Sequence, residues 1–247
     1  MHKLTEDSGG HDQSLGEIAT KDLRKAQIFK KHGLDFCCGG RKTVKQACAE
    51  KGLDVTQIEQ ELQLADQNPM TRPLPYGDWS PGFLTDYIVN THHSYVQKTL
   101  PDLRAYAAKV ARVHGSQHPE LPDVQKLVEE VNSELTSHMH KEEVVLFQYI
   151  KDLVAAANNE KPFQAVHFGT VQNPITLMEV EHEMVGRNMA EIRMLTNNYA
   201  LTEDACGSWS LLYRMLDEFE NDLHIHIHLE NNILFPKALT LEKQLNQ

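Results

Sequence analysis

The stretch that decides the fold is His226-Ile227-His228-Leu229-Glu230-Asn231-Asn232-Ile233-Leu234-Phe235. In it a histidine and a glutamate lie four residues apart, and a Leu-Phe pair follows one turn later. The same layout occurs earlier in the chain, in His138, Glu142, Leu146 and Phe147. From position 138 to position 226 the interval is 88 residues, and His93 and His182 repeat at almost the same interval. This repetition predicts two copies of one helical unit.

A histidine and a glutamate four residues apart lie on the same face of an α-helix, one turn above the other. An imidazole nitrogen and a carboxylate are thereby offered to one point in space, which is a geometry for binding a metal ion. It is also the geometry of an ordinary exposed ion pair. The face of the helix on which each pair lies decides between these interpretations.

Four long segments carry apolar residues at alternating intervals of three and four, the pattern of the inward face of an antiparallel bundle. They run over residues 89–110, 124–149, 175–192 and 209–233. Val145 falls on the inward face of the second segment, and Pro101 is expected to bend or break the first. Polar spacers at 114–122, 156–172 and 197–202 join the segments. The sequence predicts an all-α fold with an up-down antiparallel four-helix bundle over residues 81–247.

Six ionisable residues fall on this inward face, although the pattern was counted from the apolar residues. They are His93, His138, Glu142, His182, His226 and Glu230. Burying such groups costs several kcal/mol each unless something compensates. A pair of cations would compensate all six together, whereas the alternative is a buried network of His–Glu hydrogen bonds. The duplicated spacing favours the cations.

The types of ligand narrow the choice of metal. Four nitrogens and two carboxylates suit iron, manganese or zinc better than calcium, magnesium or copper(I). Two His-x3-Glu units favour two metals bridged by two carboxylates, with room for an oxo or hydroxo bridge and an open position. Glu134 and Glu181 are candidates for a second layer that accepts an imidazole N–H or relays protons. They would equally serve as solvated flanking charges.

Residues 1–67 predict a small helical domain, with helices expected near 15–33, 43–51 and 54–65. Its loop carries the adjacent cysteines Cys37 and Cys38. A proline-rich segment at 68–80 cannot continue a helix, so we place the domain boundary there.

Charge and composition exclude several classes of partner. With 24 basic and 35 acidic residues, the net charge of −11 argues against binding to a nucleic-acid backbone. There is no apolar run of membrane-spanning length, so we expect a soluble, intracellular protein with no membrane partner. Four cysteines in a chain of this length do not indicate a disulfide framework, which favours a reducing compartment.

Four stretches together resemble the iron-sulfur cluster repair di-iron proteins, also called the repair of iron centres family. These stretches are Asp35-Phe36-Cys37-Cys38-Gly39-Gly40, Ser137-His138-Met139-His140-Lys141-Glu142-Glu143, Met178-Glu179-Val180-Glu181-His182 and His226-Ile227-His228-Leu229-Glu230-Asn231-Asn232. The resemblance covers nearly the whole chain. It implies a hemerythrin-like bundle with two non-haem iron ions, preceded by a short domain with the adjacent cysteines. The four histidines named above would be terminal ligands, with Glu142 and Glu230 as bridges.

By resemblance the protein is also cytoplasmic, commonly a homodimer, and active on iron-sulfur proteins damaged by nitric oxide or peroxide. Supplying iron to these clients is the leading hypothesis. The alternatives are a di-iron enzyme that reduces nitric oxide or peroxide, and a hemerythrin-type oxygen binder or sensor. Cys37 and Cys38 would then be reversible thiols or metal ligands, with Arg41 and Lys42 lowering the thiolate pKa, or else merely small buried residues at a turn.

Overall fold

The computed structural model describes residues 13–67, 74–163 and 168–246. Within these ranges the regular structure is helical, and strand pairing is limited to a single bridge between Ser14 and Thr43. The predicted all-α class is therefore confirmed. Residues 68–73 of the expected linker lie outside the described residues. The chain divides into two compact units, one with the residues up to Trp79 together with Ile227–Leu234, the other with Ser80–His226 and Phe235–Gln247.

The first unit contains short helices whose ends are set by local sequence. They are α1 (Leu15–Lys21), α2 (Leu23–Lys31), α3 (Val44–Lys51), α4 (Val55–Asp66) and the 3-10 turn η2 (Tyr76–Asp78). Ser14 and Thr43 each form a capping box with the third residue of the helix that follows. Gly52 ends α3 in the left-handed conformation at φ 65°, which costs glycine little. Phe29 and Ile58 lie in the core of this unit.

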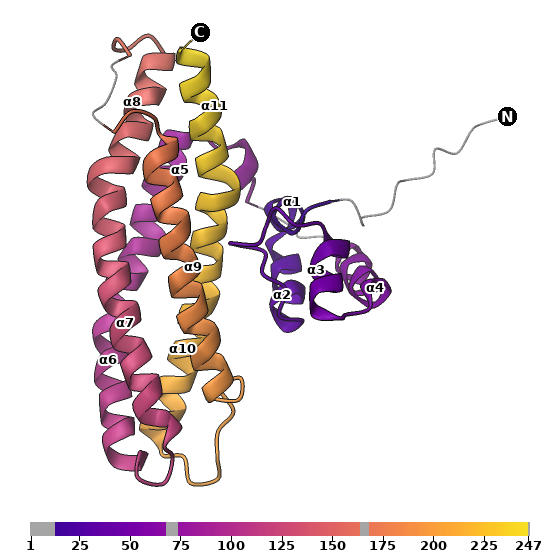
Figure 1. Cartoon of the computed structure of the whole chain (residues 1–247), viewed down its shortest axis with the longest axis vertical. Coiled ribbons are helices and arrows are strands. Elements are labelled where there is room, and N and C mark those ends of the chain that lie inside the picture. The colour runs from indigo at the N-terminus through magenta and orange to yellow at the C-terminus, as the bar shows by residue number, and fades with distance from the viewer. Residues whose placement is uncertain (1–12, 68–73, 164–167, 247) are drawn as a thin grey trace, which may run out of the picture. The chain divides into compact units, whose positions relative to one another are not determined.

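Four helical rods form the bundle, and they run alternately up and down (Figure 1). The first rod is α5 (Pro81–Ile88), η3 (Val89–His93) and α6 (Ser94–His114), and the second is α7 (Glu120–Lys141), η4 (Glu142–Leu146) and α8 (Phe147–Ala157). The third is α9 (Gln172–Leu195), and the fourth is α10 (Gly207–Leu229), η5 (Glu230–Leu234) and α11 (Phe235–Leu245). Helix α7 packs against α6 and α9, and α8 packs against α5 and α11. The predicted four-helix architecture is confirmed.

Three of the rods contain a π-helical turn, which the sequence pattern did not predict. The turns are η3, η4 and η5. A π turn holds one residue more than an α-helix needs, so it shifts the inward face by one position. The expectation for Val145 is therefore wrong, because Val145 is 39% exposed whereas Leu146 is 1% exposed.

Pro101 does not break the first rod. Helix α6 continues from Ser94 to His114 with Pro101 inside it. A proline at this position loses one backbone hydrogen bond. The buried neighbours Leu100 and Leu103 compensate, since both are packed in the core on either side of the proline.

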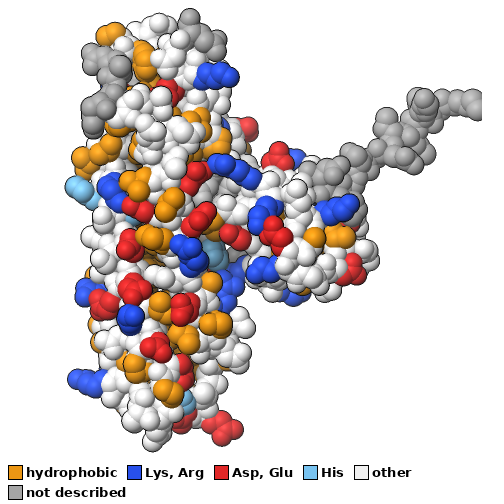
Figure 2. Space-filling view, in the orientation of Figure 1, with side chains coloured by type: hydrophobic (Ala, Val, Ile, Leu, Met, Phe, Trp, Pro, Cys, Tyr) orange, Lys and Arg blue, Asp and Glu red, His pale blue; other side chains and the backbone are white. Residues whose placement is uncertain are grey.

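The surface is polar and mixed in charge. Figure 2 shows acidic and basic side chains interspersed over the visible face, with isolated apolar side chains between them. Among the described residues, none of the helices has the length and apolar character needed to cross a bilayer.

Candidate metal centre

The six predicted ligands come from all four rods of the bundle. Glu142 and Glu230 each open a π turn, and His93 closes one. His138 lies in the last turn of α7, His182 in α9 and His226 in α10. Since π turns re-aim side chains relative to a regular helix, three of the six side chains owe their direction to these turns.

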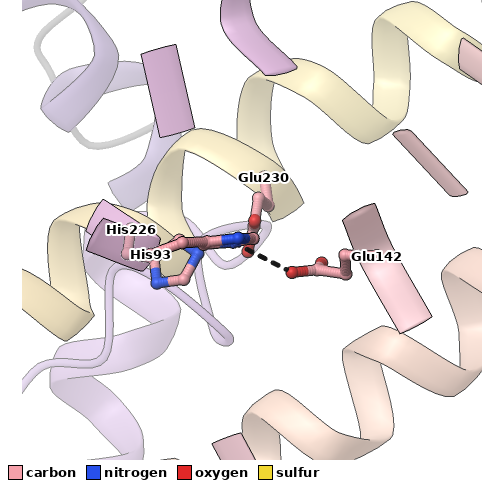
Figure 3. Close-up of side chains that lie close together, drawn as sticks. All are labelled: His93, Glu142, His226 and Glu230. Carbon is pink, nitrogen blue, oxygen red and sulfur yellow. Dashed lines mark ion pairs between the residues drawn. The ribbon is translucent and has the colours of Figure 1, made fainter. Parts of the chain in front are cut away.

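These residues form two groups that share both carboxylates. One group is His93, Glu142, His226 and Glu230, and the other is His138, Glu142, His182 and Glu230. In each group the potential ligand atoms all lie within 4.8 Å of one another. Figure 3 shows the first group, with Glu142 approaching from one side and the rings of His93 and His226, tilted by 59° to one another, next to Glu230.

Nitrogen and oxygen atoms face each other at the centre. One oxygen of Glu142 lies 3.3 Å from Nε2 of His93 and 3.3 Å from Nε2 of His138. Nε2 of His182 lies 3.0 Å from Nε2 of His138. Two imidazole nitrogens at this separation can share a hydrogen bond, or they can both bind one metal ion.

The burial of these groups supports the same interpretation. Glu142 and Glu230 are 0% exposed, and the four histidines are at most 2% exposed. Two carboxylates and four imidazoles at this depth carry a large desolvation cost, which cations bound between them would offset. The donor set of imidazole nitrogens and carboxylates fits first-row transition metals.

Two further glutamates orient the ligand histidines from outside. Nδ1 of His93 lies 2.8 Å from Glu143, and Nδ1 of His138 lies 2.8 Å from Glu181. With the proton on Nδ1, each histidine donates to its glutamate and presents Nε2 to the centre. Glu181 also pairs with Lys141, and the hydrogen bond from His138 is the main cause that lowers the pKa of Glu181.

Of the two predicted second-layer residues, only Glu181 has this role. Glu134 instead lines a surface pocket with Arg187 and Asn188. Sequence analysis missed Glu143, although its position directly after Glu142 in the resemblance stretch was a usable signal. A π turn lets consecutive residues serve the same centre, which a regular helical pattern does not.

The Leu-Phe pair of the sequence repeat also has a function in the site. Phe147 stacks on His93, with ring centroids 5.6 Å apart, and Phe235 stacks on His182 at 6.2 Å. Each copy of the repeat thus places its phenylalanine against the single histidine contributed by the preceding rod. The two stacks limit the rotation of these rings and exclude water from one side of the centre.

The buried His92 contacts the half-buried Asp222 next to the centre. Nδ1 of His92 lies 2.9 Å from Asp222. The ring of His92 is stacked on that of His226, with centroids 5.5 Å apart and planes 9° apart. His226 is therefore packed against His92, a contact that the spacing of apolar residues does not predict.

The adjacent cysteines differ from expectation in one respect. The pKa of Cys37 is raised well above its usual value by its contact with Cys38, by burial and by the nearby Asp35. The expectation that Arg41 and Lys42 lower the thiolate pKa is therefore wrong for Cys37. Lys42 is paired with Glu50, 2.5 Å away. Cys37, Cys38, Cys48 and Cys206 are free thiols.

Comparisons with known proteins agree with this geometry. Residues 11–66 match the model of ScdA_N, a domain of unknown function, and residues 85–238 match the hemerythrin HHE cation binding domain. The iron-sulfur cluster repair protein YtfE of Yersinia pestis (strain Pestoides F) is 37% identical over 234 residues, covering 92% of this chain and 97% of that protein. The same values hold for the protein of this name from Yersinia pseudotuberculosis serotype O:1b (strain IP 31758). The chain thus belongs to the family of iron-sulfur cluster repair proteins with a hemerythrin-type cation-binding domain.

Proposed function

We propose that this protein repairs damaged iron-sulfur clusters by supplying iron from a pair of non-haem iron ions in the bundle. His93 and His226 would bind one ion, and His138 and His182 the other. Glu142 and Glu230 would bridge them. The observation that carries this proposal is that both carboxylates belong to both groups of ligand atoms. When bound, such a pair supplies exchangeable iron and one-electron redox chemistry.

The chain's own residues would hold this pair in a bound but removable state. Glu143 and Glu181 accept the Nδ1 protons of His93 and His138, which fixes the ring orientation and makes Nε2 a better ligand. Glu143 is 33% exposed at its side chain, whereas Glu181 is 11% exposed. Solvent therefore reaches Glu143, which contacts His93, more easily than Glu181, which contacts His138.

The proposal is tested by restoring a client. A hydro-lyase with a [4Fe–4S] cluster is inactivated by nitric oxide and then incubated with the iron-loaded full-length protein. We expect recovery of activity with the native protein and none with the His182→Ala variant. The matched control is His140→Ala, which removes an exposed histidine of α7 and should repair as well as the native protein.

Two results would contradict iron supply. One is failure of the loaded protein to restore activity under conditions where free ferrous iron and reductant do so. The other is equal repair by His182→Ala. Metal analysis and Mössbauer spectra of protein from cells grown without added metal test the ions themselves, with two irons per chain expected. Zinc or manganese in their place would refute the assignment.

A pocket beside the centre favours one alternative, reduction of nitric oxide or peroxide. The pocket has a volume of about 660 Å³, lies between α6 and α7, and includes Met139 and Glu143 in its lining. A small molecule in this pocket would contact Glu143, the glutamate that lies 2.8 Å from His93. Catalytic turnover of nitric oxide with release of nitrous oxide would support this function. Reversible uptake of oxygen without turnover would indicate a hemerythrin-type carrier or sensor.

The resemblance also supports proposals on organisation. We propose a cytoplasmic homodimer, with domains at 1–67 and 81–247 separated by the segment 68–80. Light scattering of the purified protein would give twice the mass of the chain. A monomer at micromolar concentration would refute the dimer without touching the metal centre.

A further inference from the structure

A separate group of metal-ligand side chains lies in the loop between α2 and α3. Asp35, Cys37 and Cys38 offer one oxygen and two sulfurs, all within 4.8 Å of one another. Sγ of Cys37 lies 3.2 Å from Oδ1 of Asp35 and 4.0 Å from Sγ of Cys38. Two sulfurs bound to one tetrahedral ion at about 2.3 Å each would be about 3.8 Å apart. The two thiols are therefore already near the spacing that one ion requires.

We propose that Asp35, Cys37 and Cys38 bind a divalent first-row ion, zinc(II) or iron(II), at a site distinct from the bundle centre. Two thiolates favour these ions over magnesium and calcium, and the hard carboxylate disfavours copper(I). Three protein ligands leave a fourth position open, as in exchangeable or catalytic sites. Asp35 is exposed and Cys38 is half-buried, so solvent reaches two of the three proposed ligands.

The loop is held in this geometry by contacts that do not involve an ion. The backbone N–H groups of Cys37 and Cys38 donate to Oδ1 of Asp35 at 3.1 and 2.9 Å. The side-chain amide of Asn232 donates to the carbonyl oxygens of Cys37 at 3.0 Å and Phe36 at 3.3 Å. These bonds fix the backbone of all three ligand residues. A preorganised site pays less conformational entropy on binding than a flexible loop does.

The glycines after the cysteines make this close packing feasible. A Cβ atom on Gly40 would lie 2.3 Å from Oδ1 of Asn232 and 2.6 Å from the carbonyl oxygen of Phe36. A Cβ atom on Gly39 would lie 2.7 Å from the carbonyl oxygen of Asp35. Neither position accepts a side chain, so the turn that presents both thiols depends on the Gly-Gly pair.

The protonation of the cysteine thiols is consistent with reversible binding of a metal ion. The contact with Cys38, burial and the nearby Asp35 raise the pKa of the Cys37 thiol, and binding of an ion would displace its proton. A cation bound between the three groups would lower the pKa of both thiols, because its positive charge stabilises the thiolates. The site is independent of the iron pair proposed above, and either can exist without the other.

Cobalt(II) is the probe, because thiolate ligation gives it a charge-transfer band in the near ultraviolet that histidine and carboxylate ligation does not. It is titrated into the reduced full-length protein that retains the metal of its bundle. We expect one cobalt per chain with this band, and displacement of the band by zinc(II). Cys37→Ser and Cys38→Ser should lose the band, and Asp35→Asn should bind more weakly.

Cys48→Ser and Cys206→Ser are the matched controls and should keep the band. Cys37 is buried, so circular dichroism is used to check whether Cys37→Ser folds. If it does not fold, the result for Cys38→Ser, at a half-buried position, tests the proposal. Absence of the band in the native protein would overturn the proposal, and so would its persistence in Cys38→Ser. Iron content measured after the displacement step, when the cysteine site holds zinc(II), reports separately on the bundle centre.

Discussion

At the scale of single residues, His93 and His138, two of the proposed metal ligands, each contact a glutamate that can fix the ring tautomer. Glu181 is the most buried of these, and it contacts His138 on one side and Lys141 on the other. An amide at this position still accepts a hydrogen bond but lacks the negative charge that strengthens the imidazole as a ligand. Outer residues of this kind typically change metal affinity about 10–100-fold.

We therefore expect Glu181→Gln to release metal to a chelator faster than the native protein, by roughly 10-fold or more. The control is Glu183→Gln, two positions along the same helix and exposed. The rate is followed by the colour of the chelator complex. Equal rates for Glu181→Gln and the native protein would show that the contact with His138 does not affect the metal.

His118 gives a prediction on pH dependence far from the metal centre. Its Nε2 lies 2.9 Å from Asp204, and this hydrogen bond is the main cause that raises the pKa of His118. A group with a raised pKa in the folded state stabilises the fold below its unfolded pKa of about 6.5 and loses that contribution as pH rises through the raised value. The contact therefore favours folding at mildly acidic pH.

An NMR titration of the His118 ring should give a pKa above that of a free histidine, and Asp204→Asn should bring it down. Asp66→Asn removes an exposed acid of the first unit and should leave the titration unchanged. If Asp204→Asn had no effect, the ion pair would have no role in the titration of His118.

At the scale of secondary-structure elements, the π turn η4 determines which of Val145 and Leu146 is buried. In an uninterrupted α-helix we would expect Val145 to be the buried one. Leu146 is 1% exposed and Val145 is 39% exposed. Leu146→Ala should reduce the free energy of unfolding by about 2–5 kcal/mol, because it leaves a cavity in the core. Val145→Ala should change it by less than about 0.5 kcal/mol. Chemical denaturation measures both, and the opposite order would indicate an uninterrupted α-helix.

The same turns explain what the sequence could and could not predict about the elements. Up to the ligands, alternating spacings of three and four identified the buried face correctly, as Val124, Leu135 and His138 are all buried. Beyond Glu142 the count failed at Val145. A π turn is stabilised by tertiary placement of its side chains, and nothing in its own five residues distinguishes it from α-helix by propensity. Periodicity therefore predicts the rods and their buried faces, but it assigns Val145 in η4 wrongly before it agrees with the structure again at the buried Tyr149.

At the scale of the whole molecule, the bundle centre should couple metal binding to stability. Six buried ligands without ions carry an unfavourable desolvation energy, and an ion present at 100 times its dissociation constant adds about 2.7 kcal/mol to the free energy of unfolding. Removing the metal with a chelator should therefore lower the Tm followed by circular dichroism. In the His226→Ala variant the chelator should change the Tm much less. An identical Tm with and without metal would contradict a structural contribution of the centre.

The division into units was the least predictable feature. A repeat at intervals of 88 and 89 residues was sufficient to select the six residues that the structure brings together at the bundle centre, because duplicated spacing is visible in one sequence. The grouping of Ile227–Leu234 with the first unit depends on contacts such as that of Asn232 with the carbonyl oxygen of Cys37. A hydrogen bond from a side-chain amide to a distant backbone carbonyl produces no repeating pattern in the sequence. Such a contact can be found only in the three-dimensional structure.

The three π turns also have an evolutionary consequence. Each is equivalent to one extra codon within a helix, and each coincides with a residue at the metal centre. Loss of that codon would restore an ordinary helix and rotate everything beyond it by about 100°. The resulting gene would keep its composition and nearly all its residues, yet its product would lose the register of its core. We expect natural or engineered shortening at these three points to abolish metal uptake far more often than shortening anywhere else along the rods.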